Sequence, residues 1–261
     1  MESFPPPAGP PPAGPPPAGP PLFLVEPGTL TTAGAIQLTG PEGHHAAAVR
    51  RLRQGERADV TDGAGALAEG EVIEVGKDTV ALKLRSVCRV PPPQPRLAVA
   101  QGLPKGDRGE LAVELMTELG VDTIIPWQAA RSVTRWQGER GARALSKWRA
   151  TAREAAKQSR RPWLPEVTEL ASLTALAERV AAAATAVVLE AGAPARLHEL
   201  SWPATGEILL LVGPEGGITP GERASLAAAG AIGARLGPTV LRTSTAGAAA
   251  AAVLLARAGR W

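Results

Sequence analysis

The sequence predicts an α/β protein in which a mostly parallel sheet, with helices on both faces, follows a small domain of antiparallel strands. From residue 96 onward, apolar runs of strand length alternate with helical segments, which is typical of a parallel sheet covered on both sides. Residues 22–90 instead show short apolar runs between Gly and Asp turns, the spacing of a small antiparallel barrel or sheet. PPPQP at 91–95 separates the two patterns.

Length and composition limit the classes of protein. A chain of 261 residues is long enough for two domains with cores of their own. The net charge of +3 permits a polyanionic partner. The single cysteine, Cys88, excludes an intramolecular disulfide, and the three histidines have no acidic cluster beside them, so we expect no metal site. No apolar run reaches the roughly 18 residues of a membrane span, so we expect a cytoplasmic protein without membrane contact.

Residues 1–21 form a tail of different composition. PPPAG occurs three times in succession between Pro5 and Gly19, a repeat that favours extended polyproline II and excludes a packed core. We expect this tail to be disordered. A ligand for a proline-binding domain is the alternative.

The first domain is predicted to span residues 22–90. Its apolar runs LFLVEP, AIQLTG, RADVTDG, EGEVIEVG and DTVALKLRSV are the expected strands, with one short helix at 45–52. Four prolines in the five residues 91–95 hold neither a helix nor a central strand. They are therefore the expected linker, and the second domain begins at residue 96.

The second domain is predicted to contain five buried strands separated by helices. The strands are expected at residues 96–103, 122–127, 185–192, 207–213 and 231–237. A helix at 107–119 carries Leu111, Leu115 and Leu119 at four-residue spacing. That stripe predicts the face that packs on the sheet.

A glycine-rich turn follows the fourth of these strands, in LLVGPEGGITPGE at 210–222. Thr219 and Glu222 have the spacing of a capping box, with Pro220 at the first helical position, so a helix is expected from there to about Ala229. Ligands of open α/β sheets bind beyond the carboxyl ends of the strands, where glycine lets the backbone approach them closely. A tight turn without a ligand is an equal alternative for this motif alone.

A second motif, LGPTVLRTSTAGAAAAAVLLA at 236–256, joins the first. GPEGG together with LGPTVLRT resembles the RsmE family, the SPOUT-class methyltransferases that modify uridine N3 in 16S ribosomal RNA. HHAAAVRRLRQGE at 44–56 is similar to the family's PUA-like RNA-binding domain, and residues 103–133 and 147–167 are similar to its methyltransferase domain. The chain departs from the family pattern at Leu115, at KQSRR in 157–161 and at Ser244.

The resemblance implies a PUA-like β-barrel over residues 22–90 and a SPOUT methyltransferase domain over 96–261. The latter would carry a C-terminal trefoil knot that holds S-adenosylmethionine. It also implies a homodimer that acts on 16S rRNA or the small ribosomal subunit. The implied cofactor-binding residues are Leu189, Val212, Gly213, Pro214, Glu215, Gly216, Gly217, Leu236, Gly237, Pro238, Leu241, Arg242 and Thr243.

Arg242 and Glu215 are the candidate catalytic residues. The Arg242 guanidinium is suited to pair with a uracil oxygen as negative charge develops on the base. Glu215 would position or accept the N3 proton. An equal alternative is that its carboxylate caps a helix or binds nearby backbone.

A basic segment predicts RNA contact. Between Arg131 and Arg161, ten Lys or Arg residues face two Glu residues, and four of the six tryptophans lie in or beside the segment. Basic side chains neutralise phosphates and aromatic rings stack on unpaired bases; the alternative is a solvated helix face, with Trp148 buried. The predicted RNA-binding residues are Arg51, Lys105, Arg131, Arg153, Gln158, Arg160 and Arg161.

Two other functions stay open on the same scaffold. SPOUT-type enzymes include RNA ribose 2′-O-methyltransferases, and a non-catalytic RNA-binding protein would keep the basic surface alone.

Overall fold

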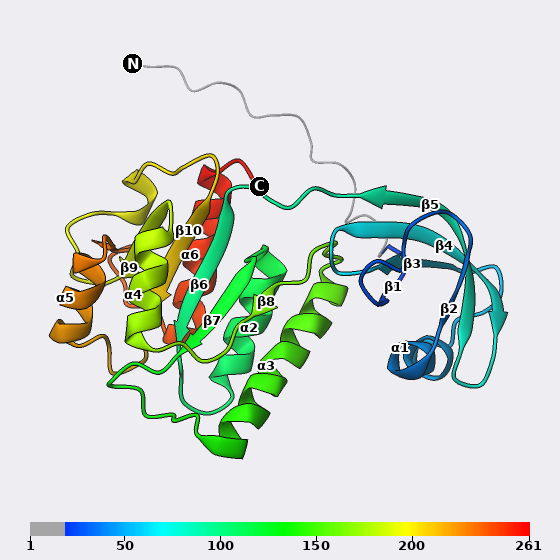
Figure 1. The fold of residues 1–261 in the computed structure, drawn as a ribbon, viewed down its shortest axis with the longest axis horizontal. Coiled ribbons are helices and arrows are strands. Elements are labelled where there is room, and N and C mark those ends of the chain that lie inside the picture. The colour runs from blue at the N-terminus through cyan, green and yellow to red at the C-terminus, as the bar shows by residue number, and fades with distance from the viewer. Residues whose placement is uncertain (1–18) are drawn as a thin grey trace, which may run out of the picture.

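The structure is a computed structural model that describes residues 19–261, in two domains joined by residues 90–95 (Figure 1). Most of the tail for which disorder was predicted lies outside the described residues. The first domain holds a five-stranded sheet in the order β1-β3-β4-β5-β2. Its neighbouring strands are antiparallel except for β1 and β3, which are parallel. The strands are β1 (Leu22–Leu24), β2 (Ala35–Leu38), β3 (Arg57–Thr61), β4 (Ala66–Val75) and β5 (Val80–Arg89).

The helical segment of this domain begins earlier than expected. Helix α1 runs over Gly40–His44 and continues as a π-helical turn over His45–Val49, with Pro41 in the first turn. Proline favours the first turn of a helix because no intrahelical acceptor awaits its missing N–H. The helical stretch ends before Arg51, which adopts a left-handed backbone with φ 54°.

The second domain is built on a six-stranded sheet in which every neighbouring pair is parallel, in the order β11-β9-β10-β6-β7-β8. All five strands predicted for this domain are present. The two-residue β8 was not predicted, because a strand of that length has no detectable periodicity. The strands are β6 (Arg96–Gly102), β7 (Thr123–Trp127), β8 (Glu166–Val167), β9 (Thr185–Leu189), β10 (Glu207–Val212) and β11 (Ile232–Ala234).

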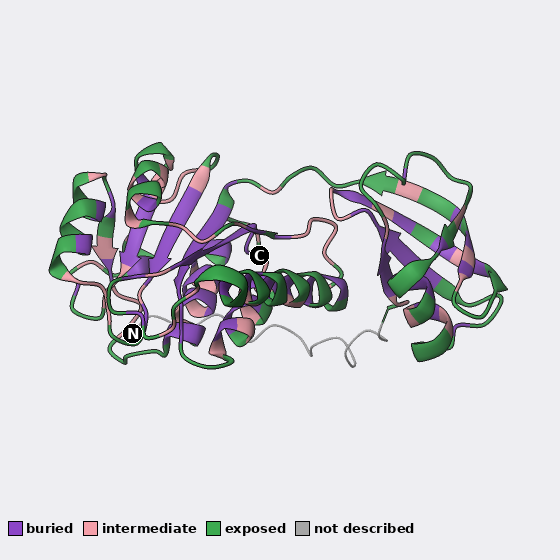
Figure 2. Cartoon of the chain, turned by 60° about the horizontal axis from the view of Figure 1, so that its bottom comes forward, coloured by how far each residue is buried: buried purple, intermediate pink, exposed green. Residues whose placement is uncertain are grey.

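Helices cover both faces of this sheet, whose strands are almost wholly buried (Figure 2). One core cluster joins α2, α3 and α6 to one face, and a second joins α4 and α5 to the other. The predicted α/β fold class is therefore confirmed. The helices are α2 (Arg108–Leu119), α3 (Gly138–Gln158), α4 (Leu173–Ala182), α5 (Pro220–Ala228) and α6 (Thr243–Arg257).

The predicted packing face of α2 is correct only in part, because Leu115 and Leu119 pack against the core but are not its most buried residues. The expected stripe was Leu111, Leu115 and Leu119, but Leu111 is 45% exposed. Val113 and Met116 are fully buried instead. Both helix faces offered apolar residues at helical spacing, and the pattern alone did not show which one the sheet covers.

The carboxyl end of α3 holds the two domains together. Glu42 of α1 accepts hydrogen bonds from Lys157 at 2.9 Å and from Arg153 at 3.2 Å. The Lys157 side chain is only 7% exposed. A buried ammonium needs such a partner, because desolvation is otherwise too unfavourable.

The segment that follows α3 adds backbone contacts to the same interface. Gly65 donates its N–H to the carbonyl of Pro162 at 2.9 Å, and Leu164 donates to the carbonyl of Gly63 at 3.0 Å. Arg160 pairs with Asp59 of β3. The linker is thus not the only connection between the domains.

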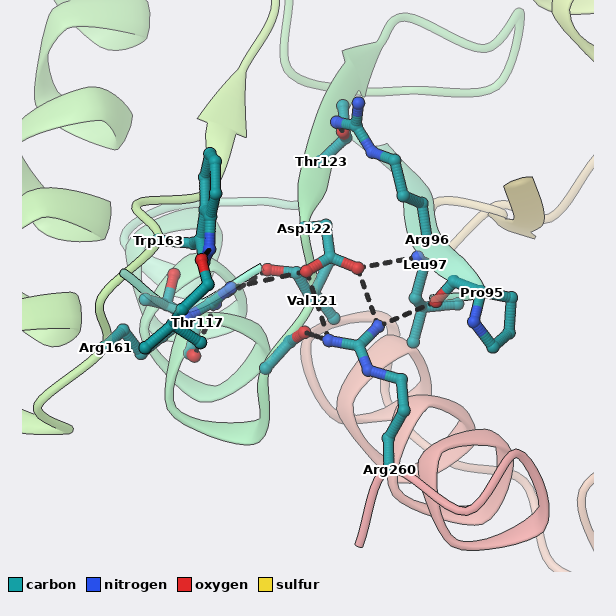
Figure 3. A network of polar contacts seen from close by, with 12 residues as sticks. Pro95, Arg96, Leu97, Thr117, Val121, Asp122, Thr123, Arg161, Trp163 and Arg260 are labelled. Atoms are coloured by element: carbon teal, nitrogen blue, oxygen red, sulfur yellow. Dashed lines mark hydrogen bonds and ion pairs between the residues drawn. The ribbon is translucent and has the colours of Figure 1, made fainter. Parts of the chain in front are cut away.

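Asp122, directly before β7, is the centre of a buried ionic network (Figure 3). Its carboxylate accepts from the backbone N–H of Leu97 at 2.8 Å and from Arg260 at 2.7 Å, and Arg161 lies 3.6 Å away. Arg161 also donates to the carbonyls of Thr117 and Val121 at 2.9 and 2.7 Å. Burial lowers the pKa of Arg161 to about 10; Asp122 opposes this and Arg260 adds to it.

Candidate cofactor pocket and RNA surface

A cavity of about 610 Å³ opens at the carboxyl ends of β9 and β10. Its size falls in the range of small-molecule sites, about 300–1,000 Å³. Three chain segments form its walls: residues 189–192 after β9, the glycine turn 212–218 after β10, and residues 236–243 before α6. The predicted residues that line it are Leu189, Val212, Gly213, Pro214, Glu215, Gly217, Leu236, Gly237, Leu241, Arg242 and Thr243.

Two predicted cofactor residues, Gly216 and Pro238, do not line this cavity. Sequence reasoning missed other lining residues, among them Arg108, Glu190 and Arg223. Glu190 and Arg223 pair with each other at 3.1 Å. The position of Glu190 directly after a buried strand was a signal that could have identified it.

The glycine turn is fixed by the start of α5. Thr219 and Glu222 form the predicted capping box, so that prediction is confirmed. Glu222 also accepts the N–H of Ala130, after β7, at 2.7 Å. Burial by itself raises the pKa of Glu222, but the hydrogen bonds from Ala130 and Thr219 outweigh this and leave the pKa below its ordinary value. A charged carboxylate therefore anchors the turn to the neighbouring loop.

The end of β11 and the residue after it pair with the connection between β9 and β10. The carbonyl of Ala234 accepts from Glu190, and Arg235 donates to Ala195 and accepts from Leu197, each at 2.9 Å. The chain then returns to α6, which packs on β6 and β10 in the middle of the sheet. Residues 190–197 thus hold the returning strand on both sides, as the expected knot requires.

The start of α6 lies directly against the glycine turn. The Thr243 hydroxyl donates to the carbonyl of Gly213 at 3.0 Å, and Gln101 of β6 donates to the carbonyl of Thr243 at 3.3 Å. Two strands and the last helix are therefore joined at the floor of the cavity. This arrangement fixes the backbone against which a ligand would bind.

The lining suits a nucleoside. Leu189, Val212, Leu236 and Leu241 offer apolar side chains. Within residues 19–261, the backbone N–H groups of 236, 237 and 239–241 donate to no other backbone group. Apolar walls with a few backbone donors are the usual means of binding and orienting a planar heterocycle.

The two candidate catalytic residues differ in their surroundings. The Glu215 carboxylate accepts the backbone N–H of Lys105 at 3.2 Å, so it holds the loop between β6 and α2. This contact favours the backbone-binding alternative for Glu215. Arg242 is exposed at the cavity, directly before α6. Among the described residues it has no ion pair or side-chain hydrogen bond, so its guanidinium is available to a substrate.

A larger side chain should block the cavity when it replaces Gly237, but not when it replaces Gly216. A Cβ at Gly216 would lie 2.8 Å from the carbonyl oxygen of Arg131 and so press on a neighbouring loop. A Cβ at Gly237 would meet nothing within 4 Å, and Gly237 lines the cavity.

We therefore expect Gly237→Val to weaken S-adenosylmethionine binding at least about tenfold, or 1.4 kcal/mol, without loss of stability. Calorimetric titration and thermal unfolding check the two parts. Gly34→Val, at a glycine of the first domain that also has open space around it and does not line the cavity, is the matched control and should bind the cofactor normally. Normal affinity in folded Gly237→Val would exclude this wall from the binding site.

The basic segment divides into residues that are ion-paired within the chain and an exposed part without ion pairs. The prediction that Arg153, Arg160 and Arg161 contact RNA stays a prediction, but all three side chains have acidic partners within the chain. Arg153 and Arg160 pair with acids of the first domain, and Arg161 is 10% exposed and bound to Asp122. Charge counting along the sequence could not reveal these distant partners.

The exposed part lies beside the cavity. Lys105 and Arg131 are exposed, and Arg131 donates to the carbonyl of Gly216 at 3.3 Å. Of the other predicted RNA-binding residues, Arg51, Arg153, Gln158 and Arg160 are also exposed, and none of them lines the cavity.

The tryptophans belong mainly to the core. Trp127 and Trp148 are 1% and 2% exposed, so the burial expected for Trp148 is confirmed. Trp127 is closed to base stacking for the same reason. The described residues contain no group of three or more side chains able to hold a metal ion. None of the described helices combines the length and apolar character needed to cross a membrane.

Comparisons with known proteins agree with this architecture. Residues 91–255 match the RNA methyltransferase domain family, and residues 38–85 match the RNA methyltransferase PUA domain family. The chain is 45% identical over 245 residues to the ribosomal RNA small subunit methyltransferase E of Mycobacterium tuberculosis, covering 92% of this chain and 93% of the relative. It is 32% identical to the protein of the same name from Bacillus subtilis, covering 82% and 87%.

Solved structures show the same fold. A putative methyltransferase from Legionella pneumophila, in complex with bound S-adenosylmethionine, superposes with a TM-score of 0.80 at 26% identity, covering 91% of this chain and 98% of that one. The ribosomal RNA small subunit methyltransferase E of Neisseria gonorrhoeae, bound to S-adenosylmethionine, gives a TM-score of 0.80 at 25% identity, with the same coverage. The chain therefore belongs to the ribosomal RNA small subunit methyltransferase E family, with the PUA-like first domain and SPOUT-type second domain of that fold.

Proposed function

We propose that this protein transfers a methyl group from S-adenosylmethionine to N3 of a uridine in 16S ribosomal RNA. The observation that carries the proposal is the cavity at the glycine turns, with the free Arg242 at its edge. The names of the relatives support a small-subunit rRNA substrate. The two solved relatives that contain S-adenosylmethionine support the cofactor.

The residues of the cavity fit this cofactor. The backbone donors of 236–241 would bind the adenine ring between the side chains of Leu189, Val212 and Leu236. S-adenosylmethionine supplies an activated methyl group. The protein's part is to hold the acceptor nitrogen in line with that group and to exclude competing orientations.

Arg242 supplies the electrostatic part of the mechanism. Uridine N3 becomes nucleophilic as it loses its proton, and the resulting charge spreads onto the two neighbouring carbonyl oxygens. An unpaired guanidinium beside the base stabilises that charge in the transition state. Glu215 contributes by holding the loop that carries Lys105, which makes it a positioning residue in this proposal.

Lys105 and Arg131 are the proposed phosphate contacts, because both are exposed beside the cavity. Their location lets the RNA backbone approach while the target base is turned out of its stack toward Arg242. The cytoplasm, where small ribosomal subunits assemble, is the corresponding location.

We further propose that the protein acts as a homodimer through α2 and α6. The outward side of α6 has Thr245, Ala249, Ala252 and Val253, none of which is charged or fully buried, and α2 adds the exposed Leu111. An uncharged helix face of this kind is typical of subunit interfaces. A monomeric mass in sedimentation at micromolar concentration would contradict the dimer.

Nucleoside mass spectrometry tests the reaction. Small subunits from cells that lack the protein are incubated with purified protein and labelled S-adenosylmethionine, and the digested 16S rRNA is analysed. We expect label in 3-methyluridine. Label in a 2′-O-methylated nucleoside would instead establish ribose methylation. Tight RNA binding without any labelled nucleoside would establish a non-catalytic binding protein.

A further inference from the structure

A second, smaller cavity lies between the loop that follows β6 and the start of α3. Its volume is about 150 Å³, below the range of about 300–1,000 Å³ that holds drug-sized ligands, so it has room for a single ring system. The loop at 104–109 joins it to the cofactor cavity: Arg108 lines the larger cavity, and Gly106 and Gly109 line the smaller one. A ligand here would lie close to the proposed methylation site.

Two tryptophans form the aromatic wall of this cavity. Trp136 and Trp148 pack edge to face with their ring centroids 4.9 Å apart. Trp148 is 2% exposed, yet its indole Nε1 has no hydrogen-bond acceptor among the described residues. A Cβ at Gly109, another lining residue, would lie 2.7 Å from this nitrogen, so the nitrogen lies at the wall of the cavity. The indole N–H of a mostly buried tryptophan normally has an acceptor.

Glu110 supplies an acceptor that lacks a donor. Its Oε1 pairs with Lys147 at 3.0 Å, while its buried Oε2 has no hydrogen-bond partner within the described chain. Glu110 lines the cavity together with Arg135 and Arg140. One unused donor, one unused acceptor and two cations therefore surround a space next to an aromatic wall.

We infer that this cavity binds one unstacked base of the substrate RNA. The base packs against the tryptophan wall. An amino or imide N–H of the base donates to Glu110, a ring nitrogen or carbonyl accepts from Trp148, and Arg140 binds the attached phosphate. Every RNA base has such a donor beside an acceptor, so the cavity selects for a base rather than for one kind of base. The inference rests on the proposed RNA substrate and adds a second recognition point to it.

Indole NMR of the full-length protein tests the inference. Protein labelled with ¹⁵N-tryptophan gives one indole signal for each of its six tryptophans, and the signal absent from Trp148→Phe belongs to Trp148. The probes are cytidine 5′-monophosphate and ribose 5-phosphate, which share the phosphate and differ in the base. We expect the nucleotide to shift the Trp148 signal saturably, at a concentration at least about tenfold lower than ribose 5-phosphate needs.

Two variants provide controls. Trp261→Phe removes an indole that is 62% exposed and lies outside the cavity, so the nucleotide response of Trp148 should be unchanged. Glu110→Ala removes the acceptor for the base N–H, so it should reduce the preference for the nucleotide over ribose 5-phosphate. A merely structural Glu110 would leave that preference unaltered.

The titration is separable from the proposed catalysis because it contains no S-adenosylmethionine and is repeated in Arg242→Ala. A Trp148 response without any methyl transfer would support the base site and contradict the proposed function. A Trp148 signal that fails to move, or that moves equally with the nucleotide and with ribose 5-phosphate, would overturn the base site even if methylation proceeds.

Discussion

Arg242→Ala is expected to transfer methyl on the order of 100-fold more slowly, the scale seen when one transition-state donor is removed. Its affinity for S-adenosylmethionine should stay nearly normal, because the guanidinium acts on charge that appears on uracil only as the N3 proton leaves. Single-turnover rates with saturating RNA, beside calorimetry with the cofactor, separate the two effects. Arg242 has no other partner among the described residues, so the variant should fold normally.

Arg242→Lys tests the geometry of the contact. An ammonium lacks the planar fork of guanidinium, so we expect little recovery of the rate. Arg257→Ala, at the exposed carboxyl end of α6, is the control for loss of a guanidinium from the same helix and should leave the rate unchanged. A normal rate in Arg242→Ala would show that Arg242 takes no part in the chemistry. Glu215 would then be the leading candidate catalytic residue.

Asp122→Ala is expected to reduce the free energy of unfolding by about 3–5 kcal/mol, the loss typical when one partner of a buried ion pair is removed. Arg161 and Arg260 are 10% and 13% exposed at the side chain. Without Asp122, both guanidinium groups would lie close together without a compensating negative charge. Urea unfolding followed by fluorescence measures the change.

The matched control is an exposed pair. Arg149 and Glu169 are 47% and 79% exposed at the side chain, so Glu169→Ala should cost less than about 1 kcal/mol. Asp122→Asn keeps a carbonyl acceptor for Leu97 and should lie between the two variants. Equal small losses in all three would show that the Asp122 network contributes no net stability.

The strands of the second domain were predictable because their signal is local. Runs such as EILLLV are buried on both faces, and the capping box at Thr219 marks the next helix. The role of α3 was not predictable from the same kind of reasoning. Its basic residues look alike in sequence, but Lys157 meets Glu42, 115 positions away, and only the fold brings that partner into contact.

The candidate site, like the fold, could be predicted from the sequence only in part. Glycines after a strand predicted the cavity correctly in outline, yet sequence could not tell Gly237, which faces open space, from Gly216, which faces another backbone. The pocket lined by Trp148 and Glu110 had no sequence signal. Its parts come from α2 and α3, and each residue alone fits an ordinary helix.

The contacts between Glu42 and α3, and between residues 63–65 and 162–164, bear on how the chain can be cut. A protease that cleaves the exposed prolines at 91 and 92 would break one covalent connection and leave these contacts intact. We expect the two fragments to migrate as a single species on gel filtration and to separate only in denaturant. Insertions at this site should likewise leave the angle between the domains unaltered, since noncovalent contacts rather than linker length set it.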